Sequence, residues 1–368
     1  MIPMARPMIG DEECAAVVAA MRSGQLAQGR AVAAFEEQFA AITQVPYAIA
    51  TSSGTTALHL ALLTHGIGPG DEVITTAFSF IASANCALYV GATPVFADID
   101  LATLNIDPQD IERKITERTR AIVAVHLYGN PAALDRITDI CRQHDLVLIE
   151  DACQAHAATF QGQTVGSFGT GCFSFYPTKN VTSGEGGIIT TADPEIDRLA
   201  RLGRSHGMPQ RYLHETLGYN FRMTDLHASI GSTQLNHLEA WTARRVRNAN
   251  VLRELLGDLP IAFQAVLPGA RHVYHQFTIR IPRGRDQVAE FLKAHGVGCE
   301  IYYPLPIHQQ PLYRRMGYDV SLPATEQAAR EVLSIPVHPS LSDEDLFIVA
   351  RTVREALAHV EATTLLPS

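Results

Sequence analysis

The sequence is poor in patterns that bind metal ions or form disulfides. Its six cysteines include no C-x-x-C pair, none shares a metal-ligand spacing with a histidine, and the H-E-x-x-H motif of metal hydrolases is absent. Isolated cysteines of this kind are typical of buried thiols in a reducing compartment. We therefore expect a cytoplasmic protein that holds no metal ion, and a metal hydrolase is a poor candidate.

The sequence also lacks the marks of a membrane or nucleic-acid-binding protein. Residues 1–7 (MIPMARP) show no basic segment followed by an apolar one, so they do not resemble a secretory signal. Residues 73–97 carry no charge, but polar residues, a glycine and a proline interrupt them, which favours a strand, a helix and another strand over a transmembrane helix. The net charge of −9 argues against a nucleic-acid partner. We expect no membrane partner either.

The first half of the chain alternates short apolar strands with helix-length segments. The predicted strands are 47–50, 73–76, 93–96, 121–126 and 146–150. This alternation predicts an α/β fold with a mostly parallel central sheet that helices cover on both faces. The next two strands, 172–175 and 187–191, are too close for a helix between them, so we expect an antiparallel pair there.

The second half indicates an excursion and a smaller unit. Residues 202–222 are polar and basic with weak periodicity, which suggests a segment that contacts another subunit. Residues 226–255 predict one long helix, and a composition shift at 257–269 suggests a boundary. We therefore expect a large cofactor-binding domain over residues 1–250 and a smaller C-terminal α+β domain over residues 251–368.

Lys179 is the most informative single residue. It follows the aromatic run FSFYPT and precedes the glycine-rich SGEGG at 183–187. A lysine between a buried strand and a loop with little side-chain bulk can have its amine desolvated against a flat ligand, as a Schiff-base lysine requires. Most lysines that follow a strand are solvated, so other segments have to support this interpretation.

Two further segments offer an anion site and an acid. Ser53-Gly54-Thr55-Thr56 lies between a predicted strand and a predicted helix, where free N–H groups favour an anion, although simple helix capping explains such a cluster equally well. Asp151 ends the strand 146–150, at the edge where open α/β sheets bind ligands, although a helix cap or a turn is the alternative. Glu150 points to the opposite face, so the two acids are no glycosidase pair.

These features together match the needs of pyridoxal phosphate. Its phosphate needs a helix N-terminus, its ring nitrogen a carboxylate, its aldehyde a lysine, and its ring face an apolar or aromatic cover. The Ser53 segment, Asp151 and Lys179 supply the first three, and Phe80, which follows the second strand, supplies the cover. Pyridoxal 5'-phosphate is therefore the expected cofactor.

At these residues the chain resembles the DegT/StrS-type sugar aminotransferases, which have the type I pyridoxal phosphate-dependent aminotransferase fold. The resemblance covers most of the first two thirds of the chain and is looser after that. Its motifs are PMIG at 7–10, FE at 35–36, SGT at 53–55, GPGDEV at 68–73, HLYG at 126–129, EDACQA at 150–155, SFYPTK at 174–179, GEGG at 184–187, GYNFRM at 218–223, YP at 303–304 and PIH at 306–308.

The resemblance implies a role for each matched residue. Lys179 forms the Schiff base and moves the proton between the substrate and cofactor carbons, and Asp151 pairs with the ring nitrogen. Among the other matched residues, Gln154 contacts the ring hydroxyl, Phe80 stacks on the ring, Gly54, Thr55, Thr56 and Ser174 hold the phosphate, and Asn220 reaches that phosphate from the partner subunit. The functional unit is then a homodimer with shared active sites.

The resemblance further implies transfer of an amino group from an amino acid, L-glutamate, to a keto sugar linked to a nucleotide diphosphate. The substrate-binding candidates are Arg6, Arg204, Arg222, Tyr303 and His308, and for each a surface charge or a packed side chain is the alternative.

Other functions remain open. In one alternative, the same reaction has a cyclitol or another keto compound as its acceptor. In another, the protein is a non-catalytic, cofactor-binding regulator. A dehydratase of the same family is less favoured, because those relatives carry histidine in place of Lys179.

Overall fold

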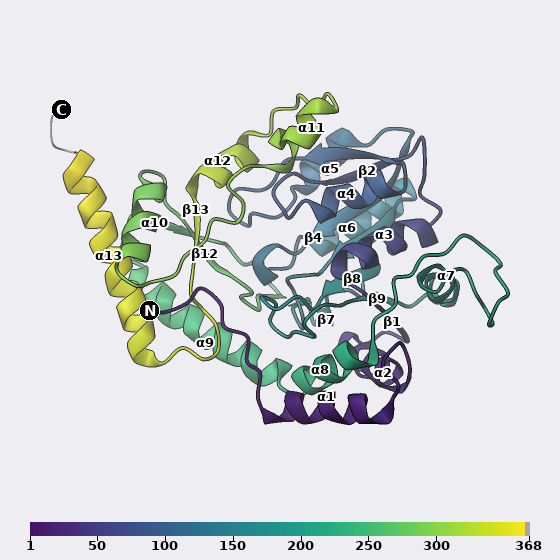
Figure 1. The fold of residues 1–368 in the computed structure, drawn as a ribbon. Helices are drawn as coiled ribbons and strands as arrows, with labels where there is room; N and C mark the ends of the chain where they lie inside the picture. The colour runs from purple at the N-terminus through teal and green to yellow at the C-terminus, as the bar shows by residue number, and fades with distance from the viewer. Residues whose placement is uncertain (365–368) are drawn as a thin grey trace.

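The computed structural model describes residues 1–364 and contains a seven-stranded sheet between two layers of helices (Figure 1). The strand order is β1-β9-β8-β5-β4-β2-β3, with bounds Tyr47–Thr51 (β1), Glu72–Thr76 (β2), Thr93–Ala97 (β3), Thr119–Val125 (β4), Val147–Asp151 (β5), Thr170–Ser174 (β8) and Gly187–Thr191 (β9). Only β9 runs antiparallel, to both β1 and β8. The predicted mostly parallel sheet and its antiparallel pair are confirmed.

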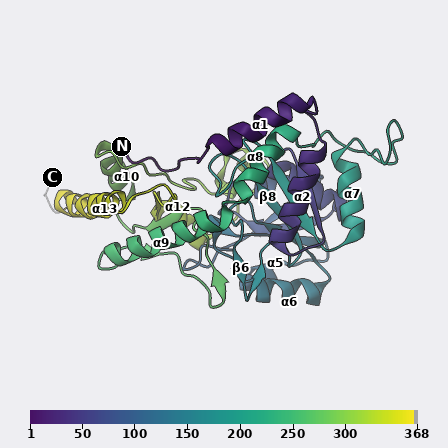
Figure 2. The same ribbon diagram turned by 90° about the horizontal axis from the view of Figure 1, so that it is seen from below.

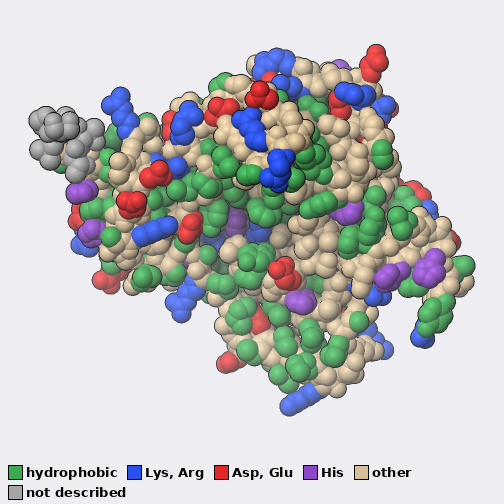
Figure 3. Space-filling view, turned by 45° about the horizontal axis from the view of Figure 1, so that its top comes forward, with side chains coloured by type: hydrophobic (Ala, Val, Ile, Leu, Met, Phe, Trp, Pro, Cys, Tyr) green, Lys and Arg blue, Asp and Glu red, His purple; other side chains and the backbone are tan. Residues whose placement is uncertain are grey.

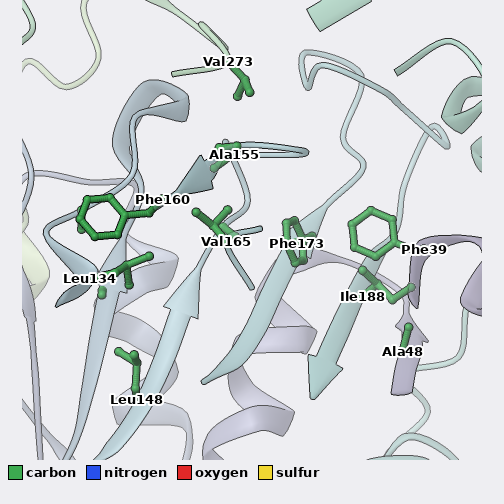
Figure 4. Close-up of a cluster of buried hydrophobic side chains, with 14 of the residues drawn as sticks. Phe39, Ala48, Leu134, Leu148, Ala155, Phe160, Val165, Phe173, Ile188 and Val273 are labelled. Atoms are coloured by element: carbon green, nitrogen blue, oxygen red, sulfur yellow. The ribbon is translucent and has the colours of Figure 1, made fainter. Parts of the chain in front are cut away.

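The sheet separates two hydrophobic clusters because neighbouring strand residues face opposite ways. In β1, Ala48 and Ala50 join one cluster, whereas Ile49 joins the other. The first cluster is packed against α2 (Arg30–Thr43), α5 (Pro108–Lys114), α6 (Leu134–His144) and α8 (Asp225–Leu235), and the second against α3 (Gly54–Thr64), α4 (Ala82–Tyr89) and α7 (Pro194–Arg204). Figure 4 shows part of the first cluster, where Phe39 and Phe173 lie edge to face.

A smaller unit lies beside this sheet (Figures 1 and 2). Its three-stranded antiparallel sheet, in the order β10-β12-β13, packs with α10, α13 and the end of α9 around a core that also includes Ile2. Its elements are α9 (Leu238–Leu256), β10 (Ala262–Phe263), β12 (Phe277–Arg280), α10 (Arg285–Ala294), β13 (Val332–Ile335) and α13 (Asp343–Thr364). The expected boundary at residue 250 falls within α9.

The predicted single helix over 226–255 is wrong. The structure divides it into α8 and α9, because the chain turns at Asn236 and His237. The apolar periodicity continues across the break, which is why the sequence hides it. The remaining elements are α1 (Asp11–Ser23), which packs on α8, the 3-10 helices Leu127–Gly129 and Ile307–Gln309, α11 (Pro311–Arg315), α12 (Pro323–Glu331), and a small sheet of β6 (Thr159–Phe160), β7 (Gln163–Thr164) and β11 (Ala270–Arg271).

The segment that follows α7 projects from the edge of the large sheet (Figure 1). Short bridges from Ser205 to Asn220 and from Gln210 to Leu213 shape it into a protruding loop. Its hydrophobic side chains are exposed, Tyr212 by 77% and Leu217 by 80%. Figure 3 shows hydrophobic and histidine side chains gathered on the lobe at this edge.

No helix within residues 1–364 has both the length and the apolarity that crossing a bilayer requires.

A buried ion cluster ties α2, β1 and α7 together. The Glu36 carboxylate accepts hydrogen bonds from the backbone N–H of Ala50 at 2.9 Å, from Arg204 at 2.5 Å and from Arg201 at 2.8 Å. Arg204 is only 3% exposed and also donates to the Ala50 carbonyl. Without Glu36, therefore, a buried guanidinium would lose its counter-charge.

We expect Glu36→Gln to lower the free energy of unfolding of the cofactor-free protein by about 3 kcal/mol, because it leaves the buried Arg204 without an anion. Urea unfolding measures this change. The matched control is Asp258→Asn, which breaks the solvent-exposed pair with Arg354 and should leave the unfolding midpoint in place. Equal effects of the two variants would show that burial of the Glu36 cluster contributes nothing to the free energy of unfolding.

Candidate active site

A cavity of about 650 Å³ opens at the carboxyl ends of the parallel strands. Asp151 ends β5, Ser174 ends β8, Phe80 follows β2, and α3 begins at Gly54 on the same edge. The residues that line the cavity are Ser53, Gly54, Thr55, Leu58, Ser79, Phe80, Ala82, Tyr128, Asp151, Cys153, Gln154, Ser174, Tyr176, Thr178, Lys179, Glu185, His275, Gln276, Tyr302 and Tyr303. The structure therefore brings together eight of the predicted site residues, namely Gly54, Thr55, Phe80, Asp151, Gln154, Ser174, Lys179 and Tyr303.

The first turn of α3 presents free backbone donors to this cavity. The N–H groups of Gly54 and Thr55 have no intrahelical acceptor, so they and the helix dipole favour an anion. Gly54 is required here because a Cβ would meet Ser174 Cβ at 2.7 Å and Cys153 Sγ at 2.8 Å. The start of the helix therefore lies directly against the end of β8.

Thr56, which the sequence predicts to hold the phosphate, has a different contact in the structure. Its hydroxyl accepts from the Ser53 N–H at 3.0 Å, while Ser53 Oγ accepts from the Thr56 N–H at 3.2 Å. This capping box turns the Thr56 side chain back on the helix start, and Thr56 does not line the cavity. The capping alternative is confirmed at Ser53 and Thr56, and the anion site at Gly54 and Thr55 stays a prediction.

Asp151 is a buried carboxylate without an ion-pair partner. It is 6% exposed, and no lysine, arginine or histidine among residues 1–364 lies within ion-pair distance. Its Oδ2 accepts from Ser83 Oγ at 2.6 Å, and its Oδ1 accepts from the Cys153 N–H at 3.2 Å. An isolated buried anion is costly, so this site favours a cationic group of a ligand in the cavity.

Lys179 extends from the loop after β8 into the same cavity. Its amine forms no hydrogen bond or ion pair with the described residues, and its burial lowers its pKa below the usual value for lysine. The nearby Cys153 and Asp151 act in the opposite direction but more weakly. A larger fraction of neutral amine is therefore present at a given pH, which suits a nucleophile toward a carbonyl carbon.

Aromatic and amide groups complete the walls. Phe80 is 55% exposed, and its ring centroid lies 6.3 Å from that of Tyr303, so its ring is accessible to a flat ligand. Gln154 Oε1 accepts from the Tyr128 N–H at 2.7 Å. This bond fixes the amide and leaves its Nε2, 3.4 Å from the Tyr303 hydroxyl, as a donor at the cavity wall.

Tyr128 is a cavity residue for which the sequence predicted no role. It takes a left-handed backbone conformation with φ of 62°, which is unfavourable for a bulky side chain. Its hydroxyl donates to the carbonyl of Tyr302, so it links the large sheet to the segment from the smaller unit. The HLYG motif at 126–129 signalled this position, but not its role.

The other cavity residues that sequence reasoning missed come from several loops. They are Ser79, Cys153, Tyr176, Thr178, Glu185, His275, Gln276 and Tyr302. Ser79 was visible only as a polar interruption of the uncharged stretch 73–97. His275 and Gln276 carried no local signal, because they precede β12 in the smaller unit and reach the cavity only through the fold.

Besides Thr56, five predicted residues lie outside the cavity of their own chain. Arg204 is held by Glu36, as described above. His308 is fully buried, with its ring 6.3 Å from that of Phe96 and its Nε2 3.4 Å from Glu326, so it cannot contact a substrate in this conformation. The other three are Arg6, Asn220 and Arg222; Arg6 is exposed, and Arg222 Nε donates to Asn220 Oδ1 at 3.0 Å.

Comparison with known proteins identifies the family. The model of the DegT/DnrJ/EryC1/StrS aminotransferase family matches residues 7–354. The chain belongs to this family. Two similar proteins are each 43% identical: the pleiotropic regulatory protein of Geobacillus stearothermophilus, over 92% of both chains, and the UDP-N-acetyl-3-dehydro-alpha-D-glucosamine 3-aminotransferase of Acidithiobacillus ferrooxidans, over 90% of this chain and 89% of that protein.

Solved structures agree with this assignment. The crystal structure of S. venezuelae DesV in complex with a ketimine intermediate is 39% identical, covers 94% of each chain and superposes with a TM-score of 0.91. The DegT/DnrJ/EryC1/StrS protein described here is thus a pyridoxal phosphate-dependent aminotransferase with the type I fold. The family, the fold and the cofactor predicted from the sequence are confirmed.

The residues present fit this cofactor. Asp151 is a buried anion that lacks a cation, as a protonated ring nitrogen requires, and the α3 N-terminus offers unpaired donors for a phosphate. Lys179 supplies an unpartnered amine in the same cavity. A buried anion, free backbone donors and a desolvated amine therefore share one space.

We expect Lys179→Met to raise the melting temperature of the cofactor-free protein by roughly 2–4 °C at pH 7. Burial lowers the pKa of Lys179 in the folded state, so the folded protein is penalised below the unfolded pKa of about 10.4, and this penalty disappears above it. The gain should shrink as the pH approaches that value, which melting curves between pH 7 and 10 test. Lys293→Met, at an exposed position, is the control, and an equal gain there would refute the explanation.

Proposed function

We propose that the protein transfers the amino group of an amino acid, L-glutamate, to a keto sugar linked to a nucleoside diphosphate. The proposal rests on one observation: the Lys179 amine and the buried Asp151 carboxylate line the same cavity, and neither forms an ion pair within residues 1–364. The Acidithiobacillus ferrooxidans relative, whose name gives a UDP-linked keto sugar as substrate, supports the choice of acceptor.

In this proposal each cavity residue has one task. When bound, pyridoxal phosphate supplies an electron sink that stabilises a carbanion at the substrate carbon. Lys179 would hold the cofactor covalently, and its amine, once free, would carry the proton from the α-carbon of the amino donor. Asp151 would keep the ring nitrogen protonated by placing a negative charge beside it. Phe80 would cover one ring face, and Gln154 would donate its amide N–H to the ring hydroxyl.

The phosphate would be held by residues from two chains. Gly54, Thr55 and Ser174 lie at the cavity wall, where the α3 N-terminus supplies backbone donors. Asn220 lies on the projecting loop, outside the cavity of its own chain. We propose that a second copy of the chain places its loop against this cavity, so that Asn220 completes the phosphate site and Arg6 or Arg222 contacts the acceptor. Exposed Tyr212 and Leu217 on this loop support such burial.

We also propose a division into a domain of residues 1–250 and a domain of residues 251–368, with Tyr303 of the second contacting the substrate. The position of Tyr303 in the cavity wall supports this role. The protein would act in the cytoplasm, where nucleotide-linked sugars are available as substrates.

The acceptor is tested with the purified, cofactor-loaded protein. The reaction is run in reverse, with 2-oxoglutarate and an amino sugar linked to UDP, dTDP or GDP. We expect the absorbance of the bound cofactor to change and glutamate to form. Lys179→Ala should still bind the cofactor but lose turnover by at least ~10³-fold, because no other amine replaces the proton carrier. Conversion of aminocyclitols instead of sugar nucleotides would reject the proposed acceptor.

The attachment site has its own readout. The chain contains three lysines, Lys114, Lys179 and Lys293, so borohydride reduction and peptide mapping should tag one peptide unambiguously. A tag at Lys114 or Lys293 would overturn the assignment of Lys179.

Shared active sites are tested by mixing inactive subunits. Lys179→Ala and Asn220→Ala should each be impaired, the first in chemistry and the second in cofactor retention. If each site takes Lys179 from one chain and Asn220 from the other, a mixed dimer contains one intact site, and co-expression should restore up to half of the wild-type activity per mixed dimer. No recovery in isolated mixed dimers would show that both residues act within one chain.

A regulatory role is the second candidate, because the Geobacillus stearothermophilus relative is named a pleiotropic regulatory protein. A regulator without turnover would bind the cofactor and show no change in its absorbance when glutamate is added. A glutamate-dependent change, followed by reversal with a keto sugar nucleotide, would favour the transfer reaction instead.

A further inference from the structure

Ser79, in the cavity wall, and Ser83, in α4, form a chain of hydroxyl groups that ends on Asp151. Ser79 Oγ lies 2.8 Å from Ser83 Oγ, and Ser83 Oγ lies 2.6 Å from Asp151 Oδ2. The exposed fractions of the three residues are 3%, 1% and 6%. All three side chains are therefore largely shielded from bulk solvent, and each bond is stronger than it would be in water.

The direction of the chain follows from the charge of its last member. An ionised carboxylate can only accept hydrogen bonds, so Ser83 uses its single O–H on Asp151. Ser83 then has only lone pairs left for Ser79, and Ser79 must be the donor in that contact. Donation by Ser79 polarises the Ser83 O–H and strengthens the bond to the carboxylate.

These contacts fix the orientation of the carboxylate. Ser83 binds one oxygen of Asp151, and the Cys153 N–H binds the other at 3.2 Å. Ser83 lies in α4, while Cys153 follows β5, so two separate elements hold the group. Asp151 ends its strand and lines the cavity, so the lone pairs that remain free are available to a ligand there.

We propose that Ser83, polarised by Ser79, is a positioning residue that holds the Asp151 carboxylate in the orientation which receives the ring nitrogen of pyridoxal phosphate. This inference rests on the proposed pairing of Asp151 with that nitrogen. Neither serine needs to contact the cofactor, because both act through Asp151. The bond from Ser83 is short and charge-assisted, and such bonds are about twice as strong as neutral ones.

A purely structural role for Ser83 makes different predictions. If its hydroxyl served only the packing of α4, its removal would lower stability but leave the bound cofactor unchanged. If Ser79 acted independently, for example by contacting a ligand itself, the effects of the two serines would add. If Ser79 instead acts through Ser83, removing the Ser79 hydroxyl has an effect only while the Ser83 hydroxyl is present.

The test uses the full-length protein with Ser79→Ala, Ser83→Ala and the double variant. The readouts are the dissociation constant of pyridoxal phosphate, the pH dependence of the absorbance of the bound cofactor, and the half-reaction rate with glutamate. We expect Ser83→Ala to weaken cofactor binding about tenfold, the value of one hydrogen bond to a charged group, and to shift the pH midpoint of the absorbance. Ser79→Ala should act in the same direction but less, and the double variant should be no worse than Ser83→Ala.

Thr75→Val is the matched control. Thr75 is a fully buried residue of the neighbouring β2, and its hydroxyl donates to the Val123 carbonyl, so the change removes a buried hydrogen bond at nearly constant volume without touching Asp151. It should lower the melting temperature yet leave the absorbance and the cofactor affinity unchanged.

Two outcomes would overturn the inference: a wild-type absorbance profile and affinity in Ser83→Ala, or additive effects of the two serines. Failure of the wild-type protein to aminate any sugar nucleotide would instead reject the proposed acceptor. The positioning role would still be decided, because cofactor affinity and absorbance require no sugar.

Discussion

The site depends on one unfavourable feature, a buried carboxylate that no cation among residues 1–364 neutralises. Asp151 accepts hydrogen bonds from the Ser83 hydroxyl and from the Cys153 N–H, and neither donor is a cation that could neutralise its negative charge. Burial of an unpaired charge costs several kcal/mol, so the fold retains Asp151 at the expense of stability. A ligand that carries a cationic ring N–H relieves this cost, which makes binding energy available for orienting the cofactor.

Lys179 is also a buried ionisable group, but its charged form is positive. Burial disfavours its charged form, and the residues around it offer no hydrogen bond to the amine. The cavity therefore keeps an anion and an amine close without letting them neutralise each other as an ion pair. If they did pair, the lysine would be held as an ammonium and could not act as a nucleophile or a base. Their separation within one cavity leaves both the carboxylate and the amine available to a ligand.

The sequence predicted the parts of this arrangement that have local causes. Asp151, Ser174 and Phe80 follow predicted strands, and parallel strands bring their carboxyl ends to one edge, so strand assignment alone places these residues together. The capping contact of Thr56 could not be predicted, because a capping box and a phosphate loop use the same residue types and only the side-chain rotamer separates them. The division of 226–255 into two helices was hidden because the periodicity is continuous across Asn236 and His237.

Residues that reach the cavity through the tertiary fold could not be predicted in this way. Tyr302, Tyr303 and His275 come from the smaller unit, and their positions depend on how that unit packs against the large sheet. The Tyr128 hydroxyl donates to the Tyr302 carbonyl, and the Tyr128 N–H donates to Gln154 Oε1, so one residue with an unfavourable backbone conformation connects the wall from the smaller unit to Gln154. A displacement of the smaller unit would therefore also change the support of Gln154. The wall from the smaller unit and the Gln154 side of the cavity are linked through Tyr128, which gives a physical reason for its unfavourable backbone conformation.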